Sequence, residues 1–337
     1  MNDVVAGDGD GAYQRVVREL GGADVVARIA GLSGSDFASL MLEVARRRAA
    51  RETPASVLRR YRGDRFVQAG AAAWRSSRRA EDLLLGCLPP DVELMTVAPL
   101  VPLGAHSALG TVSQNKVVTT IRPCEVAADP TNALALEAAI RRAAVTKANG
   151  SAAPASVRLA TIQRVTRGQL YPAGWQAHFS LFATVTAGRD EGGLRFERAA
   201  LALQLGFGVA ALRTAGLTPQ VALTPLSAAG EAIAAEAAGL GALDAEIVTD
   251  RTRTAGRGYY RDICFKVNAL LDEGPAEIGD GGFTDWTARL LANQKERLLI
   301  SGYGLDRLGA LLGLQLLGSP RPGLPLLGLP LLDASHD

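Results

Sequence analysis

The sequence predicts an α+β fold, in which helices flank an antiparallel β-sheet and a helical extension precedes the sheet. The first observation is the stretch at residues 157–188, where β-branched and aromatic residues form two strand-like runs around a loop, as in an antiparallel hairpin. The second is that helical and strand-like segments follow one another through the rest of the chain. The third is the helical spacing of apolar residues at 12–50, ahead of any strand-like run.

Length and composition limit the classes to which the chain can belong. A chain of 337 residues can form one large domain or two small ones around an ample core. The formal net charge of +2 does not by itself indicate a nucleic-acid-binding protein. The 3 cysteines and 3 histidines have no metal-ligand spacing, so we expect no metal site in the protein itself. Because the sequence has neither a secretory signal nor an apolar run of membrane-spanning length, we expect a cytoplasmic protein without membrane contact.

Residues 1–68 are expected to form the helical extension. Phe37, Leu40 and Val44 recur at the spacing of one helix face. The arginine-rich run at 46–51 has two interpretations: a solvated helix end favoured by the helix dipole, or a contact for RNA or an acidic partner. A proline at position 54 marks the first turn of a further helix.

The remaining segments are predicted in chain order. Before the hairpin, helices are expected at 71–87 and 133–144, strands at 92–97 and 117–122, and an edge hairpin at 112–118. After it, helices are expected at 196–214, 228–243 and 305–317, and strands at 221–223, 256–267 and 300–304. Residues 313–337 form a tail rich in proline, glycine and leucine.

The hairpin itself carries chemistry. Arg167 ends its first strand, Phe179 begins the second, and Pro172 and Gly174 mark the loop between them. A planar guanidinium suits a phosphate, and an aromatic face suits a purine. The alternative is a buried hairpin with an arginine at the surface.

The hairpin resembles motif 2 of the class II aminoacyl-tRNA synthetases. Three further stretches occur in the order that the histidyl-tRNA synthetase branch requires: VAADPTNALALEAA at 126–139, GRGYYRDICF at 256–265 and ISGYGLDRL at 300–308. The related regulatory subunit of ATP phosphoribosyltransferase shares this resemblance, which covers roughly residues 70–312. It implies a class II synthetase-like antiparallel sheet at 69–312. The helix, strand and proline at 71–99 resemble motif 1, which builds the dimer interface in the family, so a homodimer is implied.

The resemblance implies ATP and Mg²⁺ as cofactors. In the family, the motif 2 and motif 3 arginines contact the α- and γ-phosphates of ATP, and these positions fall on Arg167 and Arg307. The aromatic residue that stacks on adenine falls on Phe179, and Gln169 stands where the family has a glutamate. Gly304 would let the strand of motif 3 approach the nucleotide closely.

The same resemblance implies an amino-acid site. The acid and threonine that hold the substrate ammonium in the family correspond to Asp129 and Thr131, which are also natural N-cap residues of the helix that follows. Tyr259 and Tyr260 resemble the tyrosine pair that lines the side-chain pocket. Gly282 belongs to a stretch that resembles the Gly-Gly-Arg-Tyr-Asp sequence before motif 3.

Two departures from the family bear on activity. The position of its catalytic arginine is occupied by Ala255, and Arg253 and Arg257 lie two residues to either side. One of them would substitute if the strand bulges, and we take Arg257, with Arg167 and Arg307, as the candidate catalytic set.

The second departure concerns the polar residues that read histidine. Leu181 and Val185 stand in their places, so a site of this kind should not select histidine. His178 is either a new polar reader or a surface histidine.

These observations lead to two functional hypotheses and disfavour a third. The first is a stand-alone histidyl-tRNA synthetase-like paralogue that activates an amino acid or related carboxylate as an acyl-adenylate. The acyl group would pass to a small molecule, a carrier protein or a tRNA. The alternative is a non-catalytic regulatory subunit that binds a regulated enzyme of histidine biosynthesis. A complete histidyl-tRNA synthetase is disfavoured, because Leu181 and Val185 replace the residues that read histidine. The residues after 312 are too few for the family's anticodon-binding domain, and this absence favours the regulatory subunit.

Overall fold

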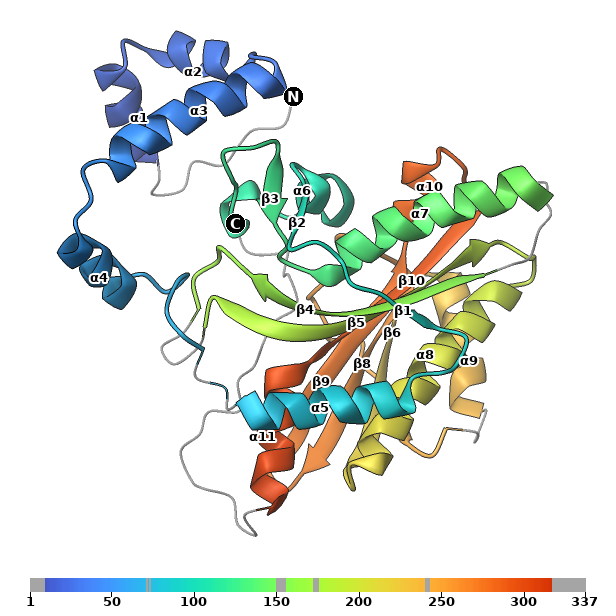
Figure 1. Cartoon of the computed structure of the whole chain (residues 1–337). Helices are drawn as coiled ribbons and strands as arrows, with labels where there is room; N and C mark the ends of the chain where they lie inside the picture. The colour runs from blue at the N-terminus through green and yellow to red at the C-terminus, as the bar shows by residue number, and fades with distance from the viewer. Residues whose placement is uncertain are drawn as a thin grey trace.

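The computed structural model describes residues 10–70, 72, 74–149, 156–171, 176–239 and 243–316. At its centre is a sheet of 8 strands (Figure 1). They are β1 (Glu93–Leu94), β4 (Val157–Thr166), β5 (His178–Arg189), β6 (Thr218–Pro225), β7 (Glu246–Thr249), β8 (Tyr260–Leu271), β9 (Gly274–Thr284) and β10 (Glu296–Gly304). The spatial order is β1-β4-β5-β10-β9-β8-β6-β7, and only the two edge pairs, β1–β4 and β6–β7, are parallel. The predicted α+β class is therefore confirmed.

Helices surround this sheet and precede it. The extension contains α1 (Asp10–Glu19), α2 (Ala23–Ala30), α3 (Gly34–Ala49) and α4 (Pro54–Gly63), which lie apart from the sheet in Figure 1. The body contains α5 (Trp74–Cys87), α6 (Ala105–Gly110), α7 (Pro130–Asn149), α8 (Arg195–Thr214), α9 (Ala228–Gly239), α10 (Trp286–Leu290) and α11 (Leu305–Leu316). A small second sheet pairs β2 (Leu100–Pro102) with β3 (Cys124–Val126). The helical pattern at 12–50 is split into three helices, first at Gly21 and Gly22, whose φ angles are 93° and 115°.

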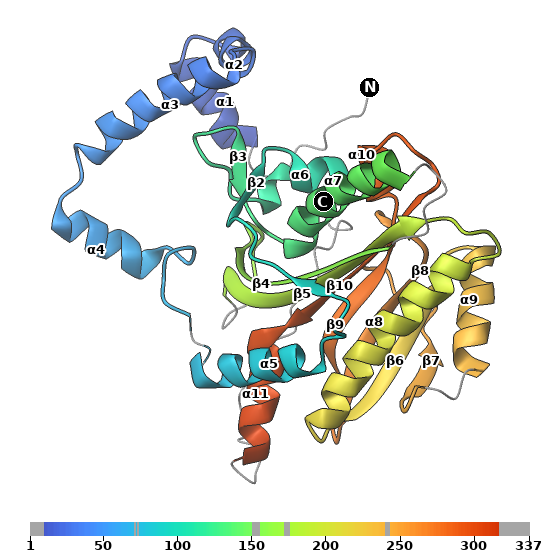
Figure 2. The ribbon, with the colours of Figure 1, turned by 45° about the vertical axis from the view of Figure 1, so that its right-hand side comes forward.

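Alternation along the strands divides the core between the two faces of the sheet. Phe182, Leu299 and Tyr303 pack on the face that α5, α8, α9 and α11 cover. Val185 and Ile300 point to the other face, where α7 packs. Figure 2 shows α8 and α9 together on the first face, with α7 on the opposite side of the strands. Successive residues of a strand face opposite sides, so the strand sequences fix which residues meet α7.

Two predicted strands are wrong. The edge hairpin expected at 112–118 is replaced by a 3₁₀ turn at Gln114–Lys116, which Ser113 caps by accepting a hydrogen bond from the Asn115 amide. The strand expected at 117–122 is reduced to a single bridge between Thr119 and Glu125. Short polar residues capture nearby backbone groups here and compete with strand pairing.

Strand β9 was missed because its sequence is rich in glycine, which weakens a strand pattern. The structure gives a packing reason for these glycines. A Cβ atom at Gly279 would lie 2.4 Å from the Tyr303 ring, and one at Gly281 would lie 2.5 Å from the carbonyl oxygen of Ile300. Larger residues would therefore push β9 away from β10.

The extension is joined to the motif 2-like hairpin by a few polar contacts. Arg65 donates from Nη1 to the Gln169 carbonyl and from Nη2 to the Gly168 carbonyl, each at 2.6 Å. His178 Nε2 lies 2.6 Å from the Gln68 carbonyl oxygen, so His178 contacts the segment that follows the extension helices. The predicted loop residues Pro172 and Gly174 and the tail after 316 lie outside the described residues. The division at 1–68, 69–312 and 313–337 stays a prediction.

Among the helices in the described part of the chain, none is long and apolar enough to span a bilayer.

Helix α7 is anchored to the sheet by a buried ion pair, and we predict that breaking it strongly destabilises the protein. Arg142 Nε and Nη2 donate to the Glu296 carboxylate at 2.9 and 3.1 Å, and both side chains are 1% exposed. Glu296→Gln would leave the guanidinium without its charge partner, so the free energy of unfolding should fall by about 3–5 kcal/mol in urea titrations.

The neighbouring pair is a matched control for this measurement. Arg141 binds Glu93 at the protein surface, where the Glu93 side chain is 56% exposed. Glu93→Gln should leave the urea midpoint close to that of the wild type, because solvent screens such pairs. Equal effects of Glu296→Gln and Glu93→Gln would contradict the anchoring role.

Candidate functional site

Two adjoining pockets open on the α7 face of the sheet. The first, here called the Tyr259 pocket, spans about 380 Å³ when the open solvent at its mouth is included. Asp129, Thr131, Tyr259 and Tyr260 are among the residues that line it. The second, the Arg307 pocket, spans about 290 Å³, again including the open solvent at its mouth. Asp280 and Gly302 line both, so the pockets share one wall.

The Arg307 pocket brings together four residues that the sequence assigns to a nucleotide: Arg167, Phe179, Gly304 and Arg307. Arg167 directly follows β4, and Phe179 is the second residue of β5, so the hairpin register places them side by side. The Arg167 guanidinium carbon lies 4.9 Å from the Phe179 ring centroid. Arg307 lies in the first turn of α11, which begins directly after β10. Because β10 pairs with β5 as far as Gly304, this turn lies beside the start of β5, where Phe179 is.

Both arginines are buried and held by acceptors from the chain. Arg167 is 1% exposed and donates from Nε to the Ala128 carbonyl at 2.9 Å, and its Nη2 lies 3.4 Å from Asp129 Oδ2. Arg307 donates to the Glu277 carbonyl, and its Nη1 lies 3.7 Å from the Glu277 carboxylate. Burial lowers the pKa of Arg307, and Glu277 opposes that shift. Fixed cations of this kind need little reorganisation to meet an anion.

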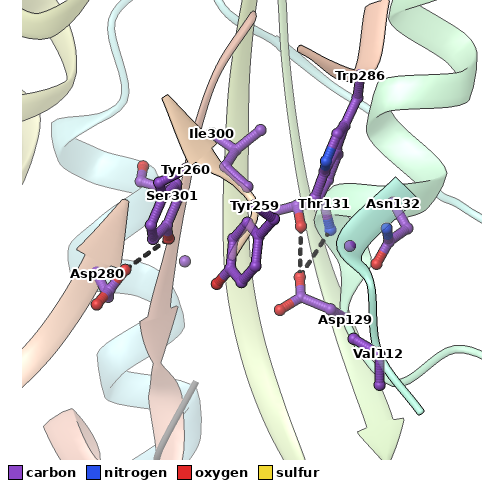
Figure 3. A pocket seen from close by; sticks show the side chains of 12 residues that line it. Val112, Asp129, Thr131, Asn132, Tyr259, Tyr260, Asp280, Trp286, Ile300 and Ser301 are labelled. Carbon is purple, nitrogen blue, oxygen red and sulfur yellow. Dashed lines mark hydrogen bonds between the residues drawn. The ribbon is translucent and has the colours of Figure 1, made fainter. Parts of the chain in front are cut away.

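Asp129 and Thr131 form the predicted N-cap of α7 and also line the Tyr259 pocket. Asp129 Oδ1 accepts hydrogen bonds from the Thr131 amide at 2.9 Å and from its hydroxyl at 2.7 Å, which caps the first turn of α7. Both side chains also line the Tyr259 pocket (Figure 3). The capping bonds fix the carboxylate in the orientation that faces the pocket.

The tyrosine pair forms an aromatic wall. The Tyr259 and Tyr260 ring centroids are 4.4 Å apart, and Trp286 lies 6.0 Å beyond Tyr259. Burial raises the pKa of both phenols, so they stay protonated donors. Gly282 lies against Tyr260, where an added Cβ would be 2.6 Å from the ring. The absence of a side chain at Gly282 therefore leaves room for the Tyr260 ring.

The two candidate catalytic arginines, Arg253 and Arg257, take different positions around the turn at Gly256. Arg257 is exposed and lies in a turn, outside the lining of both pockets as the described residues define it. Arg253 is the arginine that points inward: its Nη2 lies 2.5 Å from Asp280 Oδ2, and its Nε donates to the Ala255 carbonyl. Gly256, with a φ of 79°, turns the chain between the two arginines. The strand irregularity comes later, after Arg261, and does not bring Arg257 inward.

Gln169, which the resemblance places at the nucleotide, lies at the end of the hairpin strand away from the pocket linings. It is half-buried beyond the end of β4, and its carbonyl accepts a hydrogen bond from Arg65. Its side chain is outside the lining of the two pockets within the described part of the chain. Leu181, one of the two apolar replacements, does line the Arg307 pocket.

Asp280 is the main site residue that the sequence did not predict. Its carboxylate accepts a hydrogen bond from the Tyr260 hydroxyl at 2.6 Å and pairs with Arg253. Burial raises the pKa of Asp280 to about 7, with Arg253 opposing the shift and Glu277 adding to it. The only sequence signal was its position directly before Gly281.

A buried hydrogen-bond chain supports the site from the β2–β3 side. His106 Nδ1 lies 2.6 Å from Glu125 Oε1, and His106 Nε2 accepts the Ala128 amide at 3.0 Å, which assigns the ring proton to Nδ1. Ala128 in turn accepts from Arg167. Glu125 and His106 are therefore positioning residues for Arg167.

Across the described residues, no group of three or more His, Cys, Asp or Glu side chains is arranged to hold a metal ion.

The sheet order and the flanking helices match the fold of a class II synthetase core. No family model and no curated protein matches the sequence.

Solved structures do match the fold. A histidine–tRNA ligase subunit from Alicyclobacillus acidocaldarius matches with a TM-score of 0.55 and 14% identity, covering 74% of this chain and 96% of that one. An ATP phosphoribosyltransferase regulatory subunit/histidyl-tRNA synthetase from Bacillus halodurans has a TM-score of 0.51 and 14% identity, with 71% and 79% covered. Apo histidyl-tRNA synthetase from S. aureus has a TM-score of 0.51 and 15% identity, with 74% and 67% covered. The expected resemblance is thus confirmed at the level of the fold.

The supporting chain generates a prediction about pH. Burial would raise the pKa of Glu125, but hydrogen bonds from Gln114, His106 and Gly104 outweigh it and hold the pKa below the ordinary 4.5. A lowered native pKa stabilises the fold above pH 4.5, and this contribution is lost as the pH falls through the native value. Glu125→Gln should therefore lower the free energy of unfolding by about 1–3 kcal/mol at pH 7.

Urea titrations of wild type and Glu125→Gln between neutral and acid pH measure this difference, which should shrink as the pH is lowered. Glu43→Gln, at an exposed position of α3, is the control and should follow the wild type at every pH. A difference that stays constant with pH would show that the Glu125 charge does not contribute.

Proposed function

We propose that the protein binds ATP and activates an amino acid or related carboxylate as an acyl-adenylate, as a stand-alone relative of histidyl-tRNA synthetase. One observation carries the proposal. Arg167 and Arg307, far apart in the chain, line one cavity together with Phe179, and that cavity shares Asp280 and Gly302 with the Tyr259 pocket. A nucleotide and a carboxylate bound in the two pockets would meet at the shared wall.

The residues present fit ATP and Mg²⁺. Arg167 and Arg307 would hold phosphates, and Phe179 would pack on the base. Gly302 keeps the shared wall open, because an added Cβ would approach nothing closer than the Phe182 carbonyl at 3.9 Å. Glu277 and Asp280 line the Arg307 pocket, and one or two carboxylates plus phosphate oxygens are the usual ligands of Mg²⁺.

When bound, ATP would supply the adenylyl group that joins the carboxylate oxygen as pyrophosphate leaves. Asp129 and Thr131 would hold the ammonium of an amino acid and so orient its carboxylate towards the shared wall. Arg167 and Arg307 would stabilise the negative charge that moves onto phosphate oxygens as the bond to pyrophosphate breaks. The aromatic wall of Tyr259 and Tyr260 would exclude water from the reacting groups.

A second function is favoured by a specific observation. Ala255 stands at the family's catalytic position, and the nearest inward arginine, Arg253, is already paired with Asp280. This arrangement suits a non-catalytic regulatory subunit that binds a regulated enzyme. One of the matching structures carries the name of such a subunit.

We further propose a homodimer in the cytoplasm, with either a carrier protein, a tRNA or a small molecule as acceptor for the catalytic function. These proposals rest on the likeness of fold.

The test is ATP–pyrophosphate exchange with a panel of amino acids and related carboxylates. At least one should support exchange, and Arg307→Ala should lower the rate by about 10²–10³-fold because a fixed cation is lost at the developing charge. Gly302→Ala should weaken ATP binding by filling the shared wall, with the fold retained.

Two arginine variants are the controls. Arg213→Ala removes an exposed arginine that pairs with Asp244 at the far end of α8 and should leave exchange unchanged. Arg257→Ala should also leave it nearly unchanged, since Arg257 is exposed. Absence of exchange with every carboxylate, together with binding of a partner enzyme without nucleotide, would replace the catalytic function with the regulatory one.

A further inference from the structure

Three residues in the lining of the Tyr259 pocket have a buried side-chain donor without an acceptor in the described chain: Asn132, Trp286 and Ser301. Ser301 lies between Ile300 and Gly302 on β10, and strand alternation directs its side chain to the face on which Tyr303 packs. The other two donors are Asn132 Nδ2, in the first turn of α7, and Trp286 Nε1, at the start of α10. The two residues are only 2% and 3% exposed, and both line the pocket. Buried donors are almost always paired in folded proteins, so two unpaired donors on residues that line a cavity point to an acceptor supplied by a ligand.

The donors lie at the end of the pocket away from the nucleotide side. Asp280 marks the wall shared with the Arg307 pocket, and Figure 3 shows Asn132 and Trp286 on the opposite side of Tyr259 from Asp280. A carboxylate that is to react with ATP must face the shared wall. An acceptor that reaches Asn132 and Trp286 therefore belongs to the other end of the ligand, its side chain.

The charges around the pocket restrict that acceptor further. Asp129 and Asp280 line the pocket, and within the described chain no arginine, lysine or histidine does so. The nearest arginines already pair with these two carboxylates, Arg253 with Asp280 at 2.5 Å and Arg167 with Asp129 at 3.4 Å, so the lining offers no cation to a negatively charged side chain. An uncharged acceptor needs no such cation.

We infer that the Tyr259 pocket selects an amino acid with an uncharged, acceptor-bearing side chain, with Asn132 and Trp286 as its specificity-determining residues. A carboxamide is such a side chain, because its carbonyl oxygen has two lone pairs with which to accept hydrogen bonds and carries no charge. The aromatic rings of Tyr259 and Trp286, with centroids 6.0 Å apart, would form one continuous wall along the side chain. This inference rests on the proposed function, which sets the direction of the carboxylate.

Calorimetric titration with side chains of nearly equal shape tests the inference. Asparagine is compared with aspartate and leucine, and glutamine with glutamate and methionine. The carboxamides should bind the wild-type protein at least tenfold more tightly than their charged or apolar counterparts. Asn132→Leu and Trp286→Phe should each weaken carboxamide binding by about tenfold and reduce the preference over leucine or methionine.

The matched control is Thr287→Val. Thr287 follows Trp286 in α10 and has a buried hydroxyl without a partner in the described chain, but it lies outside the pocket lining. Its removal should leave the binding of every ligand unchanged. The melting temperature of each ligand-free variant establishes that a loss of binding is not a loss of fold.

The outcomes separate the inference from the proposed function. Carboxamide binding that depends on Asn132 and Trp286, without pyrophosphate exchange, supports the inference and removes the catalytic function. Exchange with an acidic or apolar substrate, unaffected by either variant, overturns the inference and retains catalysis. Binding of none of these amino acids also overturns the inference.

Discussion

The contact between Asp129 and Arg167 is the constraint on which the site depends. It joins the N-terminus of α7 to the end of β4, two segments that are distant in sequence and lie on different layers. Asp129 faces the Tyr259 pocket and Arg167 faces the Arg307 pocket, so one ion pair sets the relative position of both. The buried chain through His106 holds Arg167 from the other side. Because buried charges are costly when unpaired, each partner keeps the other in place.

A second ion pair, Arg253–Asp280, does the same for the shared wall. Asp280 lines both pockets while Arg253 and the Tyr260 hydroxyl bind its two oxygens. The two carboxylates of the Tyr259 pocket are thus each backed by an arginine from outside its lining. This arrangement presents carboxylate oxygens to a ligand without leaving their charge uncompensated.

The sequence predicted those parts of the site that depend on local pattern. The hairpin at 157–188 determined that Arg167 and Phe179 would be neighbours, because strand register follows from alternation. The pairing of Arg253 with Asp280 was not predictable in this way, since it depends on the turn at Gly256 and on the register of β8 against β9. Strand β9 itself was hidden by its glycines, whose reason lies in the rings and carbonyls packed against them. Likewise, Asn132 and Trp286 become site residues only once α7 and α10 are packed on the same sheet face.

A crystal structure of the protein with a non-hydrolysable ATP analogue tests the central claim most directly. The account predicts the triphosphate in the Arg307 pocket, within ion-pair distance of both the Arg167 and the Arg307 guanidinium groups, and the adenine against Phe179. Nucleotide bound at another face of the molecule, or in contact with only one of these arginines, would contradict it.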